Sequence, residues 1–226
     1  MSSSENTWAV VLAAGEGTRL SALTINSRGE FIPKQYCSVD GHGSLLQRAL
    51  ARARRVAAPG RVCVIVAEQH RRHWRGCAWP LPLGNVIVQP SNRGTANGVL
   101  LSTLTIVRRD PCARIVFLPA DHHVSDEPKL AIAVADALGS VTTDAATLAL
   151  VGIEPDDPDP ELGYILPGRV LPDGSRAVKE FVEKPHPARA RELIKAGALW
   201  NGLYSRRLVR RCSTVCGYGR AGSCGE

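Results

Sequence analysis

The chain has 226 residues, of which 44% are hydrophobic and 22% are charged, and its net charge is +7. This composition excludes a wholly disordered chain, and no apolar run approaches the roughly 20 residues that cross a bilayer. No signal peptide is apparent at the first residues, so we expect a cytoplasmic protein without a membrane partner.

Apolar runs typical of buried strands alternate with stretches of helical length. We expect strands at 8–12, 61–66, 85–88 and 115–118, with helices at about 44–57, 68–74, 95–107 and 128–138. Further strands are expected at 146–152, 164–166 and 177–182, followed by a helix at 187–195. This alternation predicts an α/β fold with a mixed, mostly parallel sheet and helices on both faces.

The pattern changes at Leu203, after which neither helical nor strand periodicity is present. We therefore expect one domain over residues 1–202 and an atypical basic tail, rich in Cys and Gly, over 203–226. Such a tail is typical of a disordered end or of a change of reading frame, and a merely flexible end is the simpler alternative.

The tail also accounts for most of the net charge. It has five arginines and one acid, Glu226, a local charge of +4 that leaves +3 for residues 1–202. Aromatic residues make up 5% of the chain and do not interleave with a basic stripe. A nucleic-acid-binding protein is therefore the least favoured hypothesis, and we expect no nucleic-acid partner.

The seven cysteines do not form a clear metal motif. Cys212 and Cys216 have the spacing of half a zinc site, but no second pair or histidine follows at ligand spacing. The cysteines in the body of the chain lie among apolar segments and are expected to be reduced thiols; they are Cys37, Cys63, Cys77 and Cys112.

A glycine-containing segment, LAAGEGTRL, directly follows the first expected strand. Ligands of open parallel sheets bind beyond the carboxyl ends of the strands. Glycines there let backbone N–H groups approach phosphate oxygens, and Arg19 adds a forked positive charge. A glycine at such a place is usually only a turn residue, and the spacing is neither that of dinucleotide folds nor that of P-loops.

Two further segments follow the same logic. Lys34 directly follows a proline and can place its ammonium group against a polyphosphate. Without the neighbouring motifs, the simpler interpretation is a solvated surface lysine. Gln89, at the end of the third expected strand, has an amide that can bond a base edge. Thr95 or Asn92 can cap the following helix, which explains part of this motif without a ligand.

Acidic and basic side chains also follow later strands. Asp121, at the end of the fourth strand and close to a phosphate loop, is placed where Mg²⁺ would bind. His122 and His123 suggest zinc, but neighbours in a strand point to opposite faces unless the loop turns them together. Glu183 can accept hydrogen bonds from sugar hydroxyls and Lys184 can bind a phosphate, whereas an isolated Glu-Lys pair is usually solvated.

Together these motifs resemble those of the sugar-phosphate nucleotidyltransferases, and most of all the mannose-1-phosphate guanylyltransferases. The resemblance covers about residues 8–202 and is more specific for the superfamily than for sugar or base. It implies a nucleotidyltransferase domain with the Rossmann-like nucleotide-diphospho-sugar transferase fold. The matching segments are LAAGEGTRL (12–20), PKQYCS (33–38), QPSNRGTA (89–96), LPADHH (118–123), GYILPG (163–168), FVEKP (181–185) and LWN (199–201).

The resemblance implies transfer of a nucleoside monophosphate from an NTP, for this family GTP, to a sugar-1-phosphate such as mannose-1-phosphate. Pyrophosphate is released, a nucleotide sugar such as GDP-mannose forms, and the implied cofactor is Mg²⁺. The attacking phosphate oxygen is already an anion, so the reaction needs alignment and cationic stabilisation and no general base. The two substrates are the implied partners, with a homo-oligomer as a possible assembly.

The resemblance also implies residue roles. The triphosphate would be bound by the backbone of Ala14, Gly15, Glu16, Gly17 and Thr18 and by the side chain of Arg19. Lys34 would neutralise charge near the α-phosphate. Gln89 and Gly94 would contact the base, Asp121 would bind Mg²⁺, Gly163, Glu183 and Asn201 would contact the sugar, and Lys184 its phosphate. The implied catalytic residues are Arg19, Lys34 and Asp121.

The chain departs from the family pattern in three places. Ala14 replaces a glycine that many relatives have, and the segment between Arg19 and Lys34 is longer than expected. No Asp or Glu lies between Glu192 and Glu226, where the family usually has a second metal-binding aspartate. We therefore expect a C-terminally truncated copy. Alternatives to an active guanylyltransferase are a non-catalytic nucleotide-binding pseudoenzyme of the same fold and a relative using another base or sugar.

Overall fold

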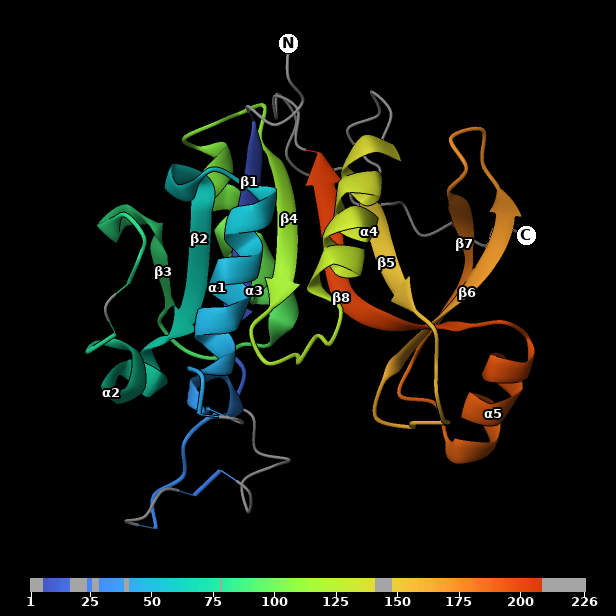
Figure 1. The fold of residues 1–226 in the computed structure, drawn as a ribbon, viewed down its shortest axis with the longest axis horizontal. Helices are drawn as coiled ribbons and strands as arrows, with labels where there is room; N and C mark the ends of the chain where they lie inside the picture. The colour runs from blue at the N-terminus through green and yellow to red at the C-terminus, as the bar shows by residue number, and fades with distance from the viewer. Residues whose placement is uncertain are drawn as a thin grey trace, which may run out of the picture.

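The computed structural model describes residues 6–16, 24–25, 29–38, 41–77, 79–140 and 148–208. Its centre is an eight-stranded sheet with the order β3-β2-β1-β4-β8-β6-β7, in which β5 pairs with β8 (Figure 1). The strands are β1 (Thr7–Ala13), β2 (Val62–Ala67), β3 (Val86–Gln89), β4 (Arg114–Pro119), β5 (Leu148–Ile153), β6 (Gly163–Val170), β7 (Arg176–Glu183) and β8 (Leu199–Leu208). The α-helices are α1 (Leu45–Val56), α2 (Arg71–Trp74), α3 (Thr95–Val107), α4 (Glu127–Ser140) and α5 (Pro187–Lys195).

The first four strands form the parallel part of the sheet. β1 pairs in parallel with β2 and β4, and β2 pairs in parallel with β3. All pairs within β5–β8, and the pair of β4 with β8, are antiparallel. The predicted α/β class with a mixed sheet is therefore confirmed, and its parallel strands are those with continuous apolar sequences.

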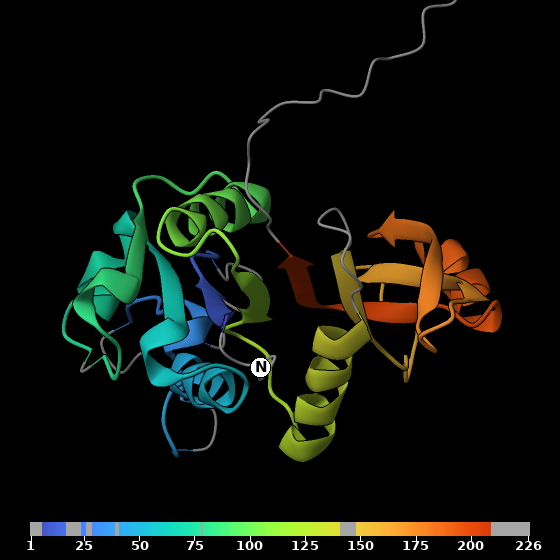
Figure 2. The same ribbon diagram turned by 90° about the horizontal axis from the view of Figure 1, so that it is seen from above.

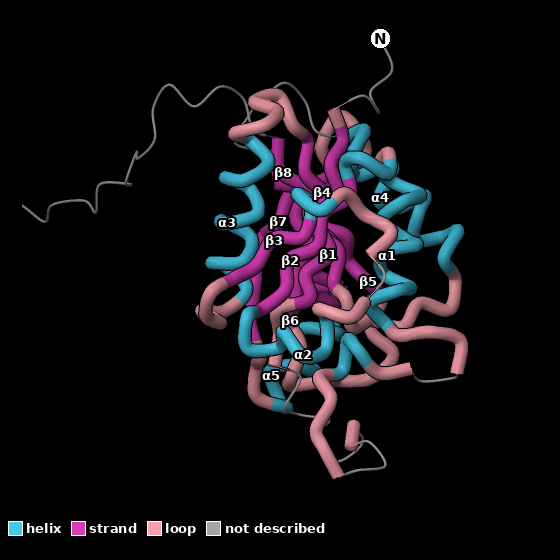
Figure 3. The backbone as a smooth tube through the Cα atoms, turned by 90° about the vertical axis from the view of Figure 1, so that its left-hand side faces the viewer, coloured by secondary structure: helices cyan, strands magenta, loops and turns pink. Residues whose placement is uncertain are grey.

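Helices cover both faces of the parallel part (Figure 3). Val64 of β2 belongs to the core cluster that includes Leu50 of α1 and Val134 of α4. Its neighbour Ile65 belongs to the cluster on the other face, which includes Ile106 of α3. Because successive residues of a strand point to opposite faces, only a strand that is apolar at every position can serve both clusters.

The second part of the sheet has its own small core. Tyr164 of β6 packs with Leu193 and Ala190 of α5, at the end of the sheet far from β3 (Figure 2). Arg189 of α5 also forms an ion pair with Glu180 of β7, with 3.0 Å between Nη2 and Oε1. These contacts show which face of β6 and β7 is covered by α5.

The expectation that regular structure stops at Leu203 is wrong for residues 203–208, because β8 runs to Leu208. The backbone of this segment pairs with β4 on one edge and with β5 on the other. Tertiary pairing on both edges overrides the missing alternation of apolar and polar residues. Residues 209–226 lie outside the described residues, so the expected tail stays a prediction there.

Two smaller expectations can also be compared with the structure. The cysteines expected to be reduced are free thiols; Cys63 is buried, and Cys77 and Cys112 are exposed. Within the described ranges, no helix combines the length and the apolar character that a membrane span requires.

An ion pair between a buried arginine and a partly exposed glutamate joins α1 to the beginning of α4. The Arg52 side chain is 4% exposed, and its Nε and Nη2 atoms donate to both carboxylate oxygens of Glu127 at 2.7–3.1 Å. We predict that Glu127→Ala lowers the free energy of unfolding by about 3 kcal/mol, because it leaves a buried guanidinium without its counter-ion.

Urea denaturation measures this loss, and Glu192→Ala is the matched control. Glu192 pairs with Arg189 at 3.2 Å, but its side chain is 64% exposed, and exposed pairs contribute less than about 1 kcal/mol. Equal losses in the two variants would contradict the importance of the Arg52–Glu127 pair.

Candidate functional site

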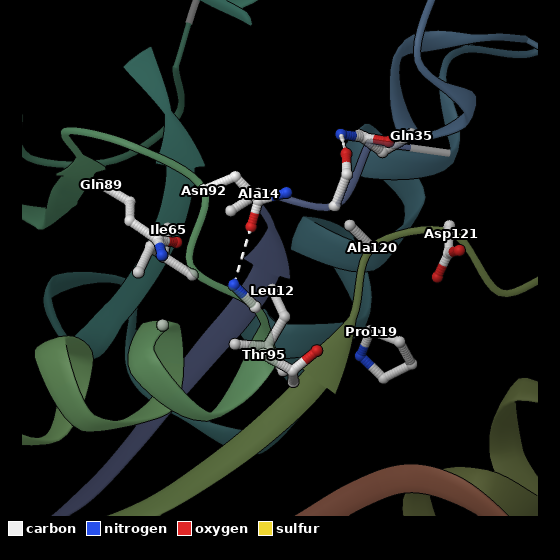
Figure 4. A pocket seen from close by; sticks show the side chains of 13 residues that line it. Leu12, Ala14, Gln35, Ile65, Gln89, Asn92, Thr95, Pro119, Ala120 and Asp121 are labelled. Carbon is white, nitrogen blue, oxygen red and sulfur yellow. Dashed lines mark hydrogen bonds between the residues drawn. The ribbon is translucent and has the colours of Figure 1, made fainter. Parts of the chain in front are cut away.

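A cavity of about 230 Å³ lies at the carboxyl ends of the parallel strands (Figure 4). This is the edge of an open α/β sheet at which ligands bind. Strand residues line its floor and the loops that follow the strands line its rim. The lining residues are Leu12, Ala14, Gly15, Gln35, Ile65, Gln89, Asn92, Gly94, Thr95, Gly98, Pro119, Ala120 and Asp121.

The turn after β1 is held by a buried glutamine that the sequence did not single out. Gln35 donates from Nε2 to the carbonyl oxygen of Ala13 at 3.0 Å and to that of Gly15 at 2.9 Å. These bonds fix the backbone of the expected phosphate loop on one side of the cavity. Gln35 follows Lys34 in a short 3₁₀ turn (Lys34–Tyr36), so the same turn brings both residues to the site.

The side chain of Glu16 connects two loops at the rim. Its Oε1 accepts hydrogen bonds from Nε2 of Gln69, at 3.2 Å, and from Nδ2 of Asn92, at 3.4 Å. Oδ1 of Asn92 in turn accepts from the backbone N–H of Gly94 at 3.0 Å. The expected helix cap by Thr95 or Asn92 is wrong, since the N-cap of α3 is Gly94, which has a φ of 83° and no side chain.

Gln89 lies at the opposite side of the cavity from Asp121 (Figure 4). Its side chain is 4% exposed, and its Nε2 is a buried donor without a hydrogen-bond partner. An ideal Cβ at Gly98 would lie 3.5 Å from Oε1 of Gln89, so the first turn of α3 packs against this amide. An unpaired buried donor in a cavity wall fits a ligand that supplies an acceptor, as a nucleobase does.

Asp121 lines one side of the cavity, and Lys34 lies beside its carboxylate. The distance between Nζ of Lys34 and Oδ2 of Asp121 is 3.8 Å, and the two side chains are 32% and 43% exposed. A partly exposed carboxylate is suited to Mg²⁺, which typically uses one or two carboxylates together with substrate phosphates. The donor set therefore fits Mg²⁺ through Asp121, with Lys34 beside it.

His122 also lies near Asp121, with 4.0 Å between its Nε2 and Oδ1 of Asp121. Burial lowers the pKa of His122, and this effect is opposed by Asp121 and reinforced by Lys34 and Arg52. Among the described residues, no group of three or more His, Cys, Asp and Glu side chains is placed to bind a metal ion. Lys34 and His122 thus both lie within 4.0 Å of the Asp121 carboxylate.

The residues expected at the sugar come together around Gly163. Gly163 of β6 pairs with Glu183 of β7, and an ideal Cβ on it would lie 2.7 Å from Oε2 of Glu183. The same Cβ would lie 3.4 Å from Cβ of Asn201 in β8. A glycine at this position therefore allows the carboxylate and the amide side chain to approach each other across the three strands.

Lys184 has a backbone conformation that L residues rarely adopt, with a φ of 47°. Its backbone N–H donates to the carbonyl oxygen of Leu162 at 3.2 Å, which closes the end of the β6–β7 pair. Non-glycine residues held in this region cost of order 1 kcal/mol or more and often occur at binding sites.

The strand pairing relates these residues to Asp121. One edge of β8 pairs with β5. The other edge pairs with β4 over one part of its length and with β6 over another. Phe117 of β4 pairs with Ser205 of β8. The two strands run in opposite directions. The chain that continues from β4 to Asp121 therefore extends toward the part of β8 that contains Asn201. The nucleotide side and the sugar side of the expected site therefore meet where β4 ends and β6 begins.

Three expected site residues, Gly17, Thr18 and Arg19, lie outside the described residues. Their roles stay predictions.

The fold is that of an α/β protein with a cavity, the candidate ligand site, at the carboxyl ends of its parallel strands. The family model described as nucleotidyl transferase matches residues 8–209. The chain belongs to this nucleotidyltransferase family.

Known proteins of this kind are similar over most of the chain. The alginate biosynthesis protein AlgA of Pseudomonas syringae pv. tomato is 34% identical over 89% of this chain and 41% of its own length. Mannose-1-phosphate guanylyltransferase of Escherichia coli is 33% identical over 86% of this chain and 43% of its own. This chain thus spans about two fifths of the length of these curated relatives.

A solved structure described as mannose-1-phosphate geranyltransferase of Thermus thermophilus has a TM-score of 0.76 and 29% identity to this chain. The match covers 90% of this chain and 57% of that one. The similarity extends through both parts of the sheet, in agreement with the predicted Rossmann-like transferase fold.

Proposed function

We propose that the protein transfers a guanylyl group from GTP to mannose-1-phosphate, forming GDP-mannose and releasing pyrophosphate. The observation that supports this most is the cavity with an unpaired buried amide, Gln89, on one side and Asp121, with Lys34 beside it, on the other. Such a cavity suits a molecule with a polar base at one end and phosphates at the other. The names of the relatives support the choice of guanine and mannose.

The proposed reaction is an in-line displacement at the α-phosphorus of the nucleotide. An oxygen of the sugar-1-phosphate forms the new P–O bond, and the bond from the α-phosphorus to the departing pyrophosphate breaks. Because the nucleophile is an anion, the residues have to align two phosphates that repel each other. When bound, Mg²⁺ would neutralise phosphate charge, and Asp121 is the residue that would hold it.

Each remaining residue has a role in alignment. The backbone of Ala14 and Gly15, fixed by Gln35, would position the phosphates, and Lys34 would stabilise charge that develops around the α-phosphorus. The carboxylate of Glu183 would accept hydrogen bonds from sugar hydroxyls, and the amide of Asn201 would donate or accept them. Lys184 would bind the phosphate of the sugar. Gln89 and the backbone of Gly94 would contact the base.

Equilibrium competition tests the nucleotide choice. A fluorescent GTP analogue is bound in the presence of Mg²⁺ and displaced with GTP, ATP, CTP or UTP. We expect GTP to displace it at a concentration at least about tenfold below that of each other nucleotide. Equal displacement by all four would contradict the choice of guanine while leaving nucleotide binding in place.

The packing around Gly163 gives a further prediction. Gly163→Ala should raise the KM for the sugar phosphate about tenfold with little change in the KM for the nucleotide, because the new methyl group displaces Glu183. Steady-state kinetics measure both constants. Gly60→Ala is the control, since its Cβ would have no atom within 4 Å. An unchanged sugar KM in Gly163→Ala would argue against a sugar site at this place.

A further inference from the structure

An exposed aromatic side chain stands among the residues proposed for the sugar. Phe181 of β7 is 47% exposed. Single exposed apolar residues are common on protein surfaces and need no explanation by themselves. What distinguishes Phe181 is the set of side chains around it and the face of the sheet on which it lies.

The strand register determines this face. Glu180 forms an ion pair with Arg189 of α5, and Val182 packs against the cluster that contains Leu193 of α5. Because neighbours in a strand point to opposite faces, Phe181 and Glu183 lie on the face that α5 does not cover. The phenyl ring and the proposed sugar-binding carboxylate therefore share one face.

Gly163 lies between these side chains. An ideal Cβ on Gly163 would be 2.7 Å from Oε2 of Glu183, 3.3 Å from Cζ of Phe181 and 3.4 Å from Cβ of Asn201. The edge of the ring, a carboxylate and an amide side chain thus surround a position that has no side chain of its own. One apolar surface with convergent polar groups is the usual composition of a small-ligand site.

We propose that the ring of Phe181 is the platform on which the pyranose of the sugar-1-phosphate lies. This inference rests on the proposed function. A pyranose has hydroxyls around its rim and a patch of C–H groups on its face, so it presents both kinds of surface that this site contains. The C–H patch would lie against the ring, and the rim hydroxyls would reach Glu183 and Asn201. Phe181 is then a residue that selects pyranose phosphates over phosphates without a sugar ring.

Calorimetric titration tests this role without requiring turnover. Mannose-1-phosphate and inorganic phosphate are each titrated into the wild-type protein and into Phe181→Ala, Phe181→Trp and Phe181→Leu. We expect Phe181→Ala to weaken binding of mannose-1-phosphate about fivefold to tenfold and to leave binding of inorganic phosphate unchanged. Phe181→Trp should stay within about twofold of the wild type, whereas Phe181→Leu should resemble Phe181→Ala.

Val178→Ala is the matched control. Val178 lies on the same strand and is 50% exposed, but it pairs with Pro167, four residues along β6 from Gly163. Binding of mannose-1-phosphate that is unchanged in Phe181→Ala, or lost equally in Val178→Ala, would overturn the platform. If the wild type binds mannose-1-phosphate no more tightly than inorganic phosphate, the platform is overturned too. Nucleotidyl transfer itself is measured separately, by pyrophosphate release.

Discussion

Asp121→Asn is expected to lower the rate of nucleotidyl transfer about 1,000-fold while leaving the fold intact. Among the described residues that line the cavity, Asp121 is the one carboxylate, and the substitution removes its charge. If Asp121 holds Mg²⁺ against the substrate phosphates, its loss removes several kcal/mol of stabilisation of the transition state, and each 1.36 kcal/mol corresponds to a factor of ten. Initial rates measured across a range of Mg²⁺ concentrations give the effect.

Asp136→Asn is the control for this prediction. Asp136 is an exposed residue of α4, and its replacement makes the same change in charge away from the cavity. We expect it to keep wild-type rates and the same Mg²⁺ dependence. Turnover by Asp121→Asn within about threefold of the wild type would contradict the role given to this carboxylate.

Lys34→Met is expected to lower kcat about 100-fold, with a much smaller change in nucleotide binding. The ammonium would act most strongly on the charge that develops at the α-phosphorus, and removing one such group typically costs 10²–10³ in kcat. Stability should change little, because the ion pair with Asp121 is about one third exposed and 3.8 Å long, and exposed pairs contribute less than about 1 kcal/mol. Rapid-quench kinetics measure the loss of kcat, and urea denaturation measures the change in stability.

The exposed lysine of α4, Lys129, provides the control for Lys34. Lys129 is exposed on another element, so Lys129→Met removes the same charge without removing the ammonium beside Asp121. Equal losses of kcat in the two variants would mean that the overall charge, and not the position of Lys34, is what matters. Lys34→Arg should restore part of the rate, since the charge returns on a longer side chain.

The sequence allowed the parallel half of the fold to be predicted well. The helix expected at 95–107 is α3, and the strands expected at 8–12 and 115–118 lie within β1 and β4. These elements have strong local signals, because a strand buried on both faces is apolar at every position. β8 beyond Leu203 has no such signal, since its pairing partners are distant in the sequence.

The same distinction holds for the site. Lys34, Gln89 and Asp121 follow strands or lie in motifs, and they could be found from the sequence together with the resemblance to a family. The sequence did not single out Gln35 and Phe181, because the roles proposed for them depend on which backbone or side chains they contact. A glutamine within an otherwise recognised motif is a weak signal that could have directed attention to Gln35.

Pyrophosphate release by the purified protein is the most direct test of the central claim. The protein is incubated with Mg²⁺, mannose-1-phosphate and each nucleoside triphosphate in turn, and the nucleotide sugar is identified by mass spectrometry. The account predicts release with GTP and formation of GDP-mannose. Absence of release with every nucleotide and with other sugar-1-phosphates, from protein shown to be folded, would contradict it and favour a non-catalytic nucleotide-binding protein of the same fold.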